Sequence, residues 1–392
     1  MDSLEKDLQF LAGGLAERQA QTDEEKRAAQ YVTERLKPST QKANMVDFPG
    51  LGTSRLLFPA YCGEFIVVSL VSFWWPTIAF FYGMVIFLAY MAEFIGYPVF
   101  SRLLPHYASS NAAGVSQSST PFAFIVFTAY LDTDDNPLTR MEATLARFYL
   151  HYVVILAMVG VLAVCGIDAL GAFYGRVHPH TDWMRWANMG LFTCFAIAGV
   201  LRAMATFDNP GANNNASGVT AMLHIADRLR ENPIEHASVL FCATGSHFAN
   251  MGGMRALLYD NPAVADTNNI YVINIEGVGA GSLHYTRAEG ILHQTPCAPE
   301  LVEAAAKTAD DYDAASCAIH NRRTNAYLPL MRGARAISVL RLEDDGLPAH
   351  YGRGSDVCDN VDVAAIQQAA LFAEAIGREV ARSDAAVLHH DG

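Results

Sequence analysis

The chain has 392 residues, of which 52% are hydrophobic and only 17% are charged, and its formal net charge is −13. A soluble domain carries about 25% charged residues, so this composition argues against a wholly soluble protein and predicts that part of the chain lies in lipid. The acidic balance gives no support to nucleic-acid binding. The seven cysteines show no paired or metal-ligand spacing, which fits a reducing compartment.

The first 55 residues are polar, mix acidic with basic side chains and show no cleavable signal peptide. Within them, residues 23–36 have the pattern of an amphipathic helix. We expect residues 1–55 to form the N-terminal part of a globular domain.

An apolar stretch follows at residues 56–100. Between Phe65 and Phe94 it contains one charged residue, Glu93. It is too long for a single membrane crossing, which takes about 20 residues. We expect a tight transmembrane hairpin that turns near Trp74, Trp75 and Pro76, because tryptophan favours the bilayer interface.

A second apolar stretch lies within residues 142–206. It is apolar from Phe148 to Tyr174 apart from His151 and Asp168, and it is apolar again over residues 186–201. Four such runs in two pairs exceed what an ordinary core uses, so we expect a second transmembrane hairpin and four helices in all. A set of buried core helices is the alternative. Asp168 is expected close to the membrane interface.

The polar start of the chain also predicts the orientation. A polar segment of that length most simply stays in the cytoplasm, and four crossings return the chain to the same side. The flanking basic residues agree, with more on the expected cytoplasmic side than on the other. They are Arg55, Arg102, Arg140, Arg147 and Arg202 against Arg176 and Arg185. We expect a multi-pass protein of the inner or cytoplasmic membrane, with its globular domain in the cytoplasm.

Residues 101–141 and 207–392 are expected to complete the globular domain. In them, strand-like runs at 122–129, 237–243, 269–275 and 334–340 alternate with helical patterns at 218–230, 251–259, 299–312 and 362–382. This alternation predicts an α/β fold with a doubly wound, mostly parallel sheet. In such a sheet the functional groups lie beyond the carboxyl ends of the strands.

Polar and aromatic residues follow the expected strands, at the edge where functional groups are expected. Tyr130 and Asp132 come after the first strand, and Glu276 comes after the third. Three further stretches are GANNNASGV at 211–219, TGSHFANMGG at 244–253 with His247 and Phe248, and PAHYGRGSDVCDNVD at 348–362 with His350 and Asp356. This order and spacing resemble the co-catalytic, two-zinc aminopeptidase family. The resemblance covers nearly all of the chain outside the apolar stretches, including the N-terminus, where the family has an opening helix with Arg and Thr.

The resemblance implies a fold of the zinc-aminopeptidase type, interrupted by the two hairpins. It also implies two zinc ions that polarise the scissile carbonyl and activate a bridging water. These ions need imidazole and carboxylate ligands, and a free carboxylate must take the proton of the water. Tyr130 stands where the family has its first His ligand, while Asp132, which would orient that His, remains. Asn214 stands where the family has the bridging Asp, and an amide lacks the charge of that ligand.

The remaining positions of the resemblance are also altered. His247 and Phe248 stand where the family has a Glu-Glu pair that supplies the general base and a ligand. Glu276 is still competent as a ligand, and the final His ligand would fall at His350 or Gly352, a few residues before Asp356. Because positions 130, 214, 247 and 248 have lost their normal roles, we expect a pseudoenzyme with no catalytic residues and no metal or other cofactor.

Degenerate members of this family serve as recognition or scaffold subunits, so the resemblance implies a structural or accessory subunit of a membrane protein complex. The expected partners are the lipid bilayer and other integral membrane subunits, with no nucleic acid. Two alternatives stay open. One is a membrane-bound metallopeptidase or other hydrolase with a remodelled site, in which His247, Glu276 and His350 hold a single metal. The other is a module that binds peptides or amines in the former cleft.

Overall fold

A computed structural model gives the fold and describes residues 3–52, 54–119, 121, 123–147, 150–174, 181–260 and 270–390. Phe122, Phe148, Asn269 and Arg176 lie outside the described residues, so the expectations made for them stay predictions. The chain divides into two compact units. The sheet unit comprises Met1–Gly52, His106–Thr144 and Phe207–Gly392, and the helical unit comprises Thr53–Pro105 and Leu145–Thr206.

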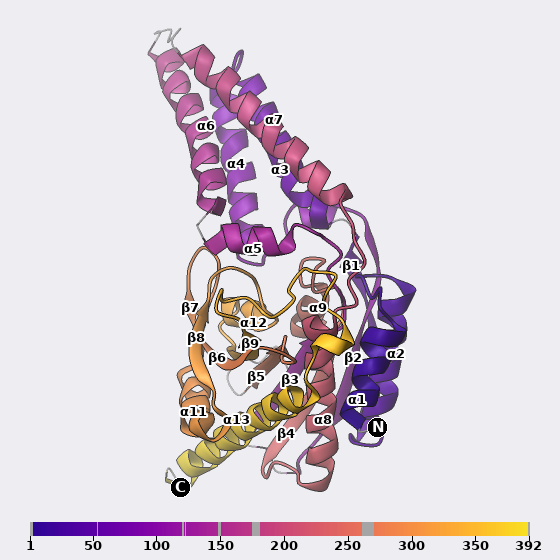
Figure 1. Ribbon diagram of the computed structural model, residues 1–392. Coiled ribbons are helices and arrows are strands. Elements are labelled where there is room, and N and C mark those ends of the chain that lie inside the picture. The colour runs from indigo at the N-terminus through magenta and orange to yellow at the C-terminus, as the bar shows by residue number, and fades with distance from the viewer. Residues whose placement is uncertain are drawn as a thin grey trace. The chain divides into compact units, whose positions relative to one another are not determined.

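Within the described residues, the sheet unit contains one sheet of nine strands (Figure 1). Its strands are β1 (Lys42–Leu51), β2 (His106–Ser116), β3 (Ala123–Tyr130), β4 (Ala237–Thr244), β5 (Ile270–Glu276), β6 (Ser282–Glu289), β7 (Thr295–Pro296), β8 (Ala315–Ile319) and β9 (Arg335–Leu342). They lie in the order β1-β2-β4-β3-β5-β9-β6-β7, and β8 pairs with β6.

The sheet is mixed, so the parallel arrangement that we expected holds only for part of it. Strands β4, β3, β5 and β9 run parallel at the centre, as do β6 and β8. The pairs β1–β2, β2–β4, β6–β9 and β6–β7 are antiparallel. The reason lies in the connections, because a parallel return needs a long crossover, whereas β6 begins shortly after β5 ends and must run back.

Helices cover both faces of this sheet (Figure 1). The first layer has α1 (Ser3–Leu8), α2 (Asp23–Leu36), α8 (Ser217–Glu231), α11 (Pro299–Ala309) and α13 (Val363–His390), and the second has α9 (Gly252–Asp260) and α12 (Tyr327–Met331). In β3, Ile125 and Phe127 belong to the core under the first layer and Val126 to the core under the second. This alternation is the two-residue period of a strand buried on both faces.

Local sequence signals explain where several helices begin. Thr22 caps α2, because its Oγ1 accepts a hydrogen bond from the Glu25 backbone N–H at 3.2 Å. Pro299 stands at the start of α11, and Pro76 opens α4 (Pro76–Phe94) of the helical unit. Proline suits the first helical position because the N–H that it lacks has no partner within the helix there.

The helical unit is built from α3 (Leu57–Val71), α4, α6 (Leu150–Phe173) and α7 (Asp182–Met204). Four of the described helices, spanning Ser54–Val71, Pro76–Phe94, His151–Phe173 and Asp182–Met204, are long and apolar enough to cross a membrane. Their shared core includes Phe65, Met158 and Phe192, which are all fully buried. Length and composition therefore agree with the four expected crossings, while the structure contains no bilayer.

A buried ion pair ties α6 to α7 inside the helical unit. Arg185 Nη2 lies 2.6 Å from Asp168 Oδ2, and Thr181 Oγ1 donates a 2.9 Å hydrogen bond to Asp168 Oδ1. The Arg185 guanidinium also lies 5.1 Å from the ring centroid of Phe73, in the turn between α3 and α4. Asp168, expected near the interface, is thus buried and paired near the end of α6, because a lone carboxylate among apolar helices is costly.

Each helical hairpin leaves and re-enters the sheet unit at neighbouring points. Leu51 of β1 pairs with His106 of β2 on the two sides of the first hairpin. On the two sides of the second, Phe207 N donates to Asp135 O at 2.9 Å, and Asn209 Nδ2 donates to Asp134 O at 2.7 Å. The two ends of each hairpin therefore lie next to each other in the sheet unit, so each hairpin is an insertion that leaves the connectivity of the sheet intact.

Candidate functional site

The carboxyl ends of β3, β4 and β5 bring most of the expected site residues together in the sheet unit. Tyr130 ends β3 and pairs with Thr244, which ends β4 and is followed by Gly245, Ser246 and His247. Glu276 ends β5, one strand away from β4 on the other side of β3. The loop of Asn213, Asn214 and Asn215 enters α8 beside these ends, since Asn215 Nδ2 donates to Ile275 O at 3.2 Å. We call this region the cleft, after the former cleft considered from the sequence, although most of its residues are buried.

Three aromatic rings fill the β3–β4 side of the cleft. The rings of Tyr130 and His247 stack with centroids 4.1 Å apart and planes 12° apart. Phe248 stands edge-on to both, at 5.6 Å from Tyr130 and 5.1 Å from His247. Burial, together with the nearby charge of Glu276, raises the pKa of the Tyr130 hydroxyl well above its usual value. Tyr130 therefore stays protonated at neutral pH.

Asp132 is fully buried and accepts hydrogen bonds from the backbone. His247 N donates to its Oδ1 at 2.7 Å, and Phe248 N donates to its Oδ2 at 2.9 Å. Asp132 thus holds the loop after β4 in place instead of orienting a metal-binding imidazole. A second buried carboxylate, Glu25 of α2, supports the same loop, because it accepts a 2.6 Å bond from Ser246 N. Burial raises the pKa of both carboxyls, and for Asp132 the charge of Glu25 adds to the effect.

Asp356 plays the same part for the asparagine loop. Its Oδ1 accepts from Asn213 N at 2.6 Å, and its Oδ2 accepts from Asn214 N at 3.1 Å and from Asn214 Nδ2 at 3.0 Å. The Asn214 side chain therefore presents its NH₂ group to a carboxylate, and its Oδ1 has no hydrogen-bond partner among the described residues. Burial raises the pKa of Asp356, and these amide donors oppose that effect.

Glu276, the expected surviving metal ligand, is held by an arginine. Its Oε1 lies 3.3 Å from Arg322 Nη2 and 3.4 Å from Arg322 Nε, and its Oε2 accepts from Asn274 Nδ2 at 3.0 Å. The side chains of Glu276 and Arg322 are only 3% and 5% exposed, so this is a buried ion pair. The Arg322 guanidinium also lies 5.7 Å from the ring centroid of Tyr351.

His350 does not join Glu276 at a common point. It has a backbone φ of +59°, and its Nδ1 forms a 2.9 Å hydrogen bond with Ser355 Oγ. Gly352, the other position considered for the last ligand, has no side chain to offer. The ring nitrogen Nδ1 of His247 is likewise used, in a 2.9 Å hydrogen bond with Asn325 Oδ1.

Arg322 and Asn325 were not predicted from the sequence; they lie together in the polar stretch HNRRTNA at 320–326 between β8 and α12. Asn325 also donates from its Nδ2 to Thr244 Oγ1 at 2.7 Å. Two adjacent arginines followed by Thr and Asn, directly after a strand-like run, are the signal that could have identified this segment. It was missed because it lies outside the positions that carry the family resemblance.

A test of the donor set shows that these residues do not fit a metal centre. Among the described residues, no three His, Cys, Asp or Glu side chains are grouped so that they could hold a metal ion. Asp132 and Asp356 face backbone amides, and Glu276 faces a guanidinium. The arrangement therefore fits neither two zinc ions nor the single metal considered for His247, Glu276 and His350.

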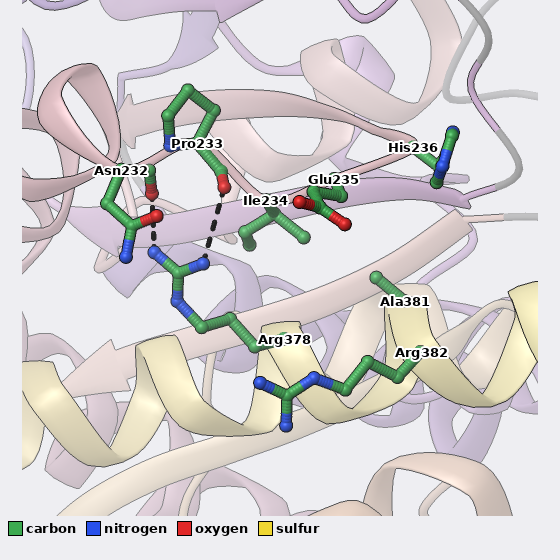
Figure 2. A pocket seen from close by; sticks show the side chains of 8 residues that line it. All are labelled: Asn232, Pro233, Ile234, Glu235, His236, Arg378, Ala381 and Arg382. Carbon is green, nitrogen blue, oxygen red and sulfur yellow. Dashed lines mark hydrogen bonds between the residues drawn. The ribbon is translucent and has the colours of Figure 1, made fainter.

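The described surface also has a hollow of about 310 Å³ at the opposite end of β4, between α13 and residues 232–236, which join α8 to β4 (Figure 2). Figure 2 shows Arg378 reaching across it to the backbone oxygens of Asn232 and Pro233. Its Nε also contacts Glu374 Oε1 at 2.8 Å. This guanidinium is therefore engaged by the protein itself, and the hollow lies at the amino end of β4, away from the loop that holds His247.

Comparisons with known proteins agree with the fold. The family model described as peptidase family M28 matches residues 180–376. No curated protein matches the chain by sequence. Among solved structures, a Zn-dependent exopeptidase from Parabacteroides distasonis is 12% identical with a TM-score of 0.54, covering 98% of this chain and 97% of its own.

Two further solved structures show the same likeness. The zinc aminopeptidase BSAP from Bacillus subtilis is 12% identical with a TM-score of 0.55, covering 96% of this chain and 94% of its own. A glutaminyl cyclase from Bacteroides thetaiotaomicron, bound to N-acetylhistamine, is 12% identical with a TM-score of 0.53, covering 96% and 97%. At these identities the likeness shows the fold alone.

Proposed function

The chain belongs to peptidase family M28, and we propose that it is a catalytically silent, membrane-embedded member that serves as an accessory subunit of a membrane protein complex. The observation that carries the proposal is the state of the cleft. The acidic side chains at the expected site positions, Asp132, Glu276 and Asp356, are all held by protein groups.

The chemistry of hydrolysis supports this conclusion. A two-zinc peptidase needs carboxylates with free lone pairs to bind its ions, and one more carboxylate to take a proton from water. In the cleft, the lone pairs of Asp132 and Asp356 are directed to backbone N–H groups. His247 and Phe248, at the positions of the base and a ligand, pack against Tyr130. The residues that remain support the shape of the cleft, and this favours a scaffold over a hydrolase.

The dimensions of the helical unit support insertion into a bilayer. Its apolar helices have 18 to 23 residues. At a rise of 1.5 Å per residue, such helices are roughly 27–35 Å long, close to the hydrocarbon thickness of about 30 Å. All four tryptophans of the chain lie in this unit, and each is more than half exposed. They are Trp74, Trp75, Trp183 and Trp186.

These tryptophans gather at one end of the helical unit. Trp74 and Trp75 lie in the turn between α3 and α4, and Trp183 and Trp186 lie in the first turns of α7. The Trp186 ring is 5.3 Å from the ring of Phe73 in the same α3–α4 turn, which places both pairs at the same end. An exposed tryptophan cluster at the end of apolar helices is typical of a membrane–water interface.

Helix α7 supports a role in assembly. Only 11% of its apolar window is buried, against 28% to 39% in the other three helices. Its exposed residues include Gly190, Thr193 and Cys194, which are smaller or more polar than lipid-facing positions favour. Small residues let helices approach closely in membranes, so this part of α7 suits contact with another transmembrane helix.

Purification from native membranes in a mild detergent tests the proposal. We expect a tagged protein to elute with stoichiometric partner subunits, and a Gly190→Leu variant to lose them while it still inserts. Gly160→Leu on α6 is the matched control, since a Cβ at either glycine meets no other atom within 4 Å. Elution of the wild-type protein as a lone monomer, or equal loss of partners in both variants, would contradict the proposal.

A further inference from the structure

The cleft keeps a buried negative charge although its donor set does not fit a metal. Glu276 is 3% exposed, and moving a carboxylate out of water without a counter-charge is strongly unfavourable. In a metallopeptidase of this fold the metal ions supply the positive charge at the strand ends. In this chain the cation nearest to the Glu276 carboxylate is the Arg322 guanidinium, with two nitrogens within 3.4 Å of one carboxylate oxygen.

Arg322 is not loosely placed, because the residues beside it are bound to the sheet. Thr324 Oγ1 donates to Glu289 Oε2, and it accepts a 3.1 Å bond from Ser338 Oγ of β9. Asn325 bridges Thr244 at the end of β4 and the ring of His247. On the other side of Arg322, Asn321 Nδ2 donates to Gly346 O at 3.3 Å. We call residues 321–326 the strap, since it contacts the ends of β4 and β5 through Asn325 and Arg322.

The strap and Glu276 belong to one buried polar network. Asn274 Nδ2 donates both to Glu276 Oε2 at 3.0 Å and to Ser338 Oγ at 3.1 Å, so it links the ion pair to the anchor of the strap. Glu289, which receives the Thr324 hydroxyl, also accepts a 2.8 Å bond from Thr286 Oγ1. A fully connected network of buried hydrogen bonds holds its side chains rigidly. This network therefore fixes the position of the Arg322 side chain.

We propose that the Arg322 guanidinium is the resident cation of the cleft, where it replaces the metal charge of the family, and that the strap is the element that delivers it. This inference rests on the proposed loss of the metal site and adds how the protein tolerates that loss. The folded sheet unit is then independent of metal ions, and its stability depends on the charge at position 322.

Charge-swap variants of the full-length protein in detergent or nanodiscs test the proposal. Thermal unfolding is monitored by hydrogen-exchange mass spectrometry of peptides from β4 and β5. Tryptophan fluorescence is unsuitable, because all four tryptophans lie in the helical unit and do not report on the sheet unit. Arg322→Met removes the charge but keeps much of the length, and we expect the melting temperature of these peptides to fall by roughly 10 °C. Exposed Arg353 supplies the matched control, and Arg353→Met should leave it unchanged.

Two rescues separate charge from packing. Combining Arg322→Met with Glu276→Gln removes both charges and should recover most of the lost melting temperature. Guanidinium ion at a non-denaturing millimolar concentration should raise the melting temperature of Arg322→Ala, while urea at the same concentration should not. Zinc or manganese should leave the wild-type melting temperature unchanged.

The opposite results overturn the inference. If the double variant is as unstable as Arg322→Met, the arginine acts by packing alone. If Arg322→Met melts like the wild type, or if zinc stabilises the wild type, Arg322 is not the resident cation. If Arg322→Met does not fold, the double variant and Arg322→Lys supply the same comparison. None of these outcomes bears on co-purification with partners, so failure of the accessory role is detected separately.

Discussion

The buried carboxyls of Glu25 and Asp132 lead to a prediction about pH. Both side chains are at most 1% exposed, and both accept hydrogen bonds from the loop that follows β4. Burial raises the pKa of each above its value in the unfolded chain, where such groups titrate near pH 4. From about pH 4 into the neutral range, the folded protein therefore holds more protons than the unfolded chain.

The sign follows from linkage. The slope of the unfolding free energy against pH is proportional to the number of protons bound by the unfolded state minus the number bound by the native state. This difference is negative here, so stability falls as pH rises. The stabilisation that comes from these two carboxyls is fully present below about pH 4, and it is lost as pH rises through their raised pKa values. If the pair retains one extra proton between them, the sheet unit loses about 1.4 kcal/mol for each unit of pH across this window.

Glu25→Gln tests the prediction. The variant removes one acid and its repulsion of Asp132, so its stability should depend much less on pH. At pH 5 we expect the variant to be about 1 kcal/mol less stable than the wild type, because an amide side chain accepts fewer hydrogen bonds than the carboxyl group of Glu25. This difference in stability should close or reverse by pH 8. The assay is urea unfolding of the sheet unit, followed by hydrogen exchange at several pH values.

The matched control is Glu34→Gln, an exposed acid on the same helix, which should keep the wild-type slope. A wild-type stability that is flat or rises between pH 5 and pH 7 would contradict the prediction. A Glu25→Gln variant that retains the full wild-type slope would contradict it equally, since the titrating pair would then lie elsewhere.

Two further predictions concern the position of the tryptophans in the membrane and the expected lack of catalytic activity. Because all four tryptophans lie at one end of the helical unit, lipids brominated near the headgroup should quench their fluorescence more than lipids brominated near the bilayer centre, and the reverse order would contradict an interfacial position. The purified protein should release no product from aminoacyl nitroanilides and should not cyclise peptides with N-terminal glutamine, the activities named for its structural neighbours. Turnover that is abolished by His247→Ala would instead revive the hydrolase alternative.

Much of the sheet unit could be predicted from local patterns. The strand expected at 237–243 is β4 at Ala237–Thr244, and the strand expected at 334–340 is β9 at Arg335–Leu342. Apolar runs of this length, bounded by polar residues, favour strands over helices. Strand direction is different, because it depends on which strands become neighbours. The mixed sheet was therefore not predicted.

The candidate site divides in the same way. Tyr130, His247 and Glu276 each follow a strand, so their gathering at one edge of the sheet could be predicted. Their partners could not be predicted, because they come from elsewhere in the chain. Arg322 is 46 residues from Glu276, and Asn325 is 78 residues from His247.

Residue patterns along the chain were enough to predict the class of the fold and the two apolar insertions, and the family resemblance added the expectation that positions 130, 214, 247 and 248 lack the usual metal ligands. These properties depend on residue type and local spacing, which a linear chain displays directly. The partners of these residues became visible only in the folded chain: a stacked Tyr130–His247 pair, carboxylates directed to backbone amides, and Arg322 beside Glu276. A buried charge needs a counter-charge close to it in space, and here that charge comes from a segment distant in sequence, which packing and hydrogen bonds hold in place.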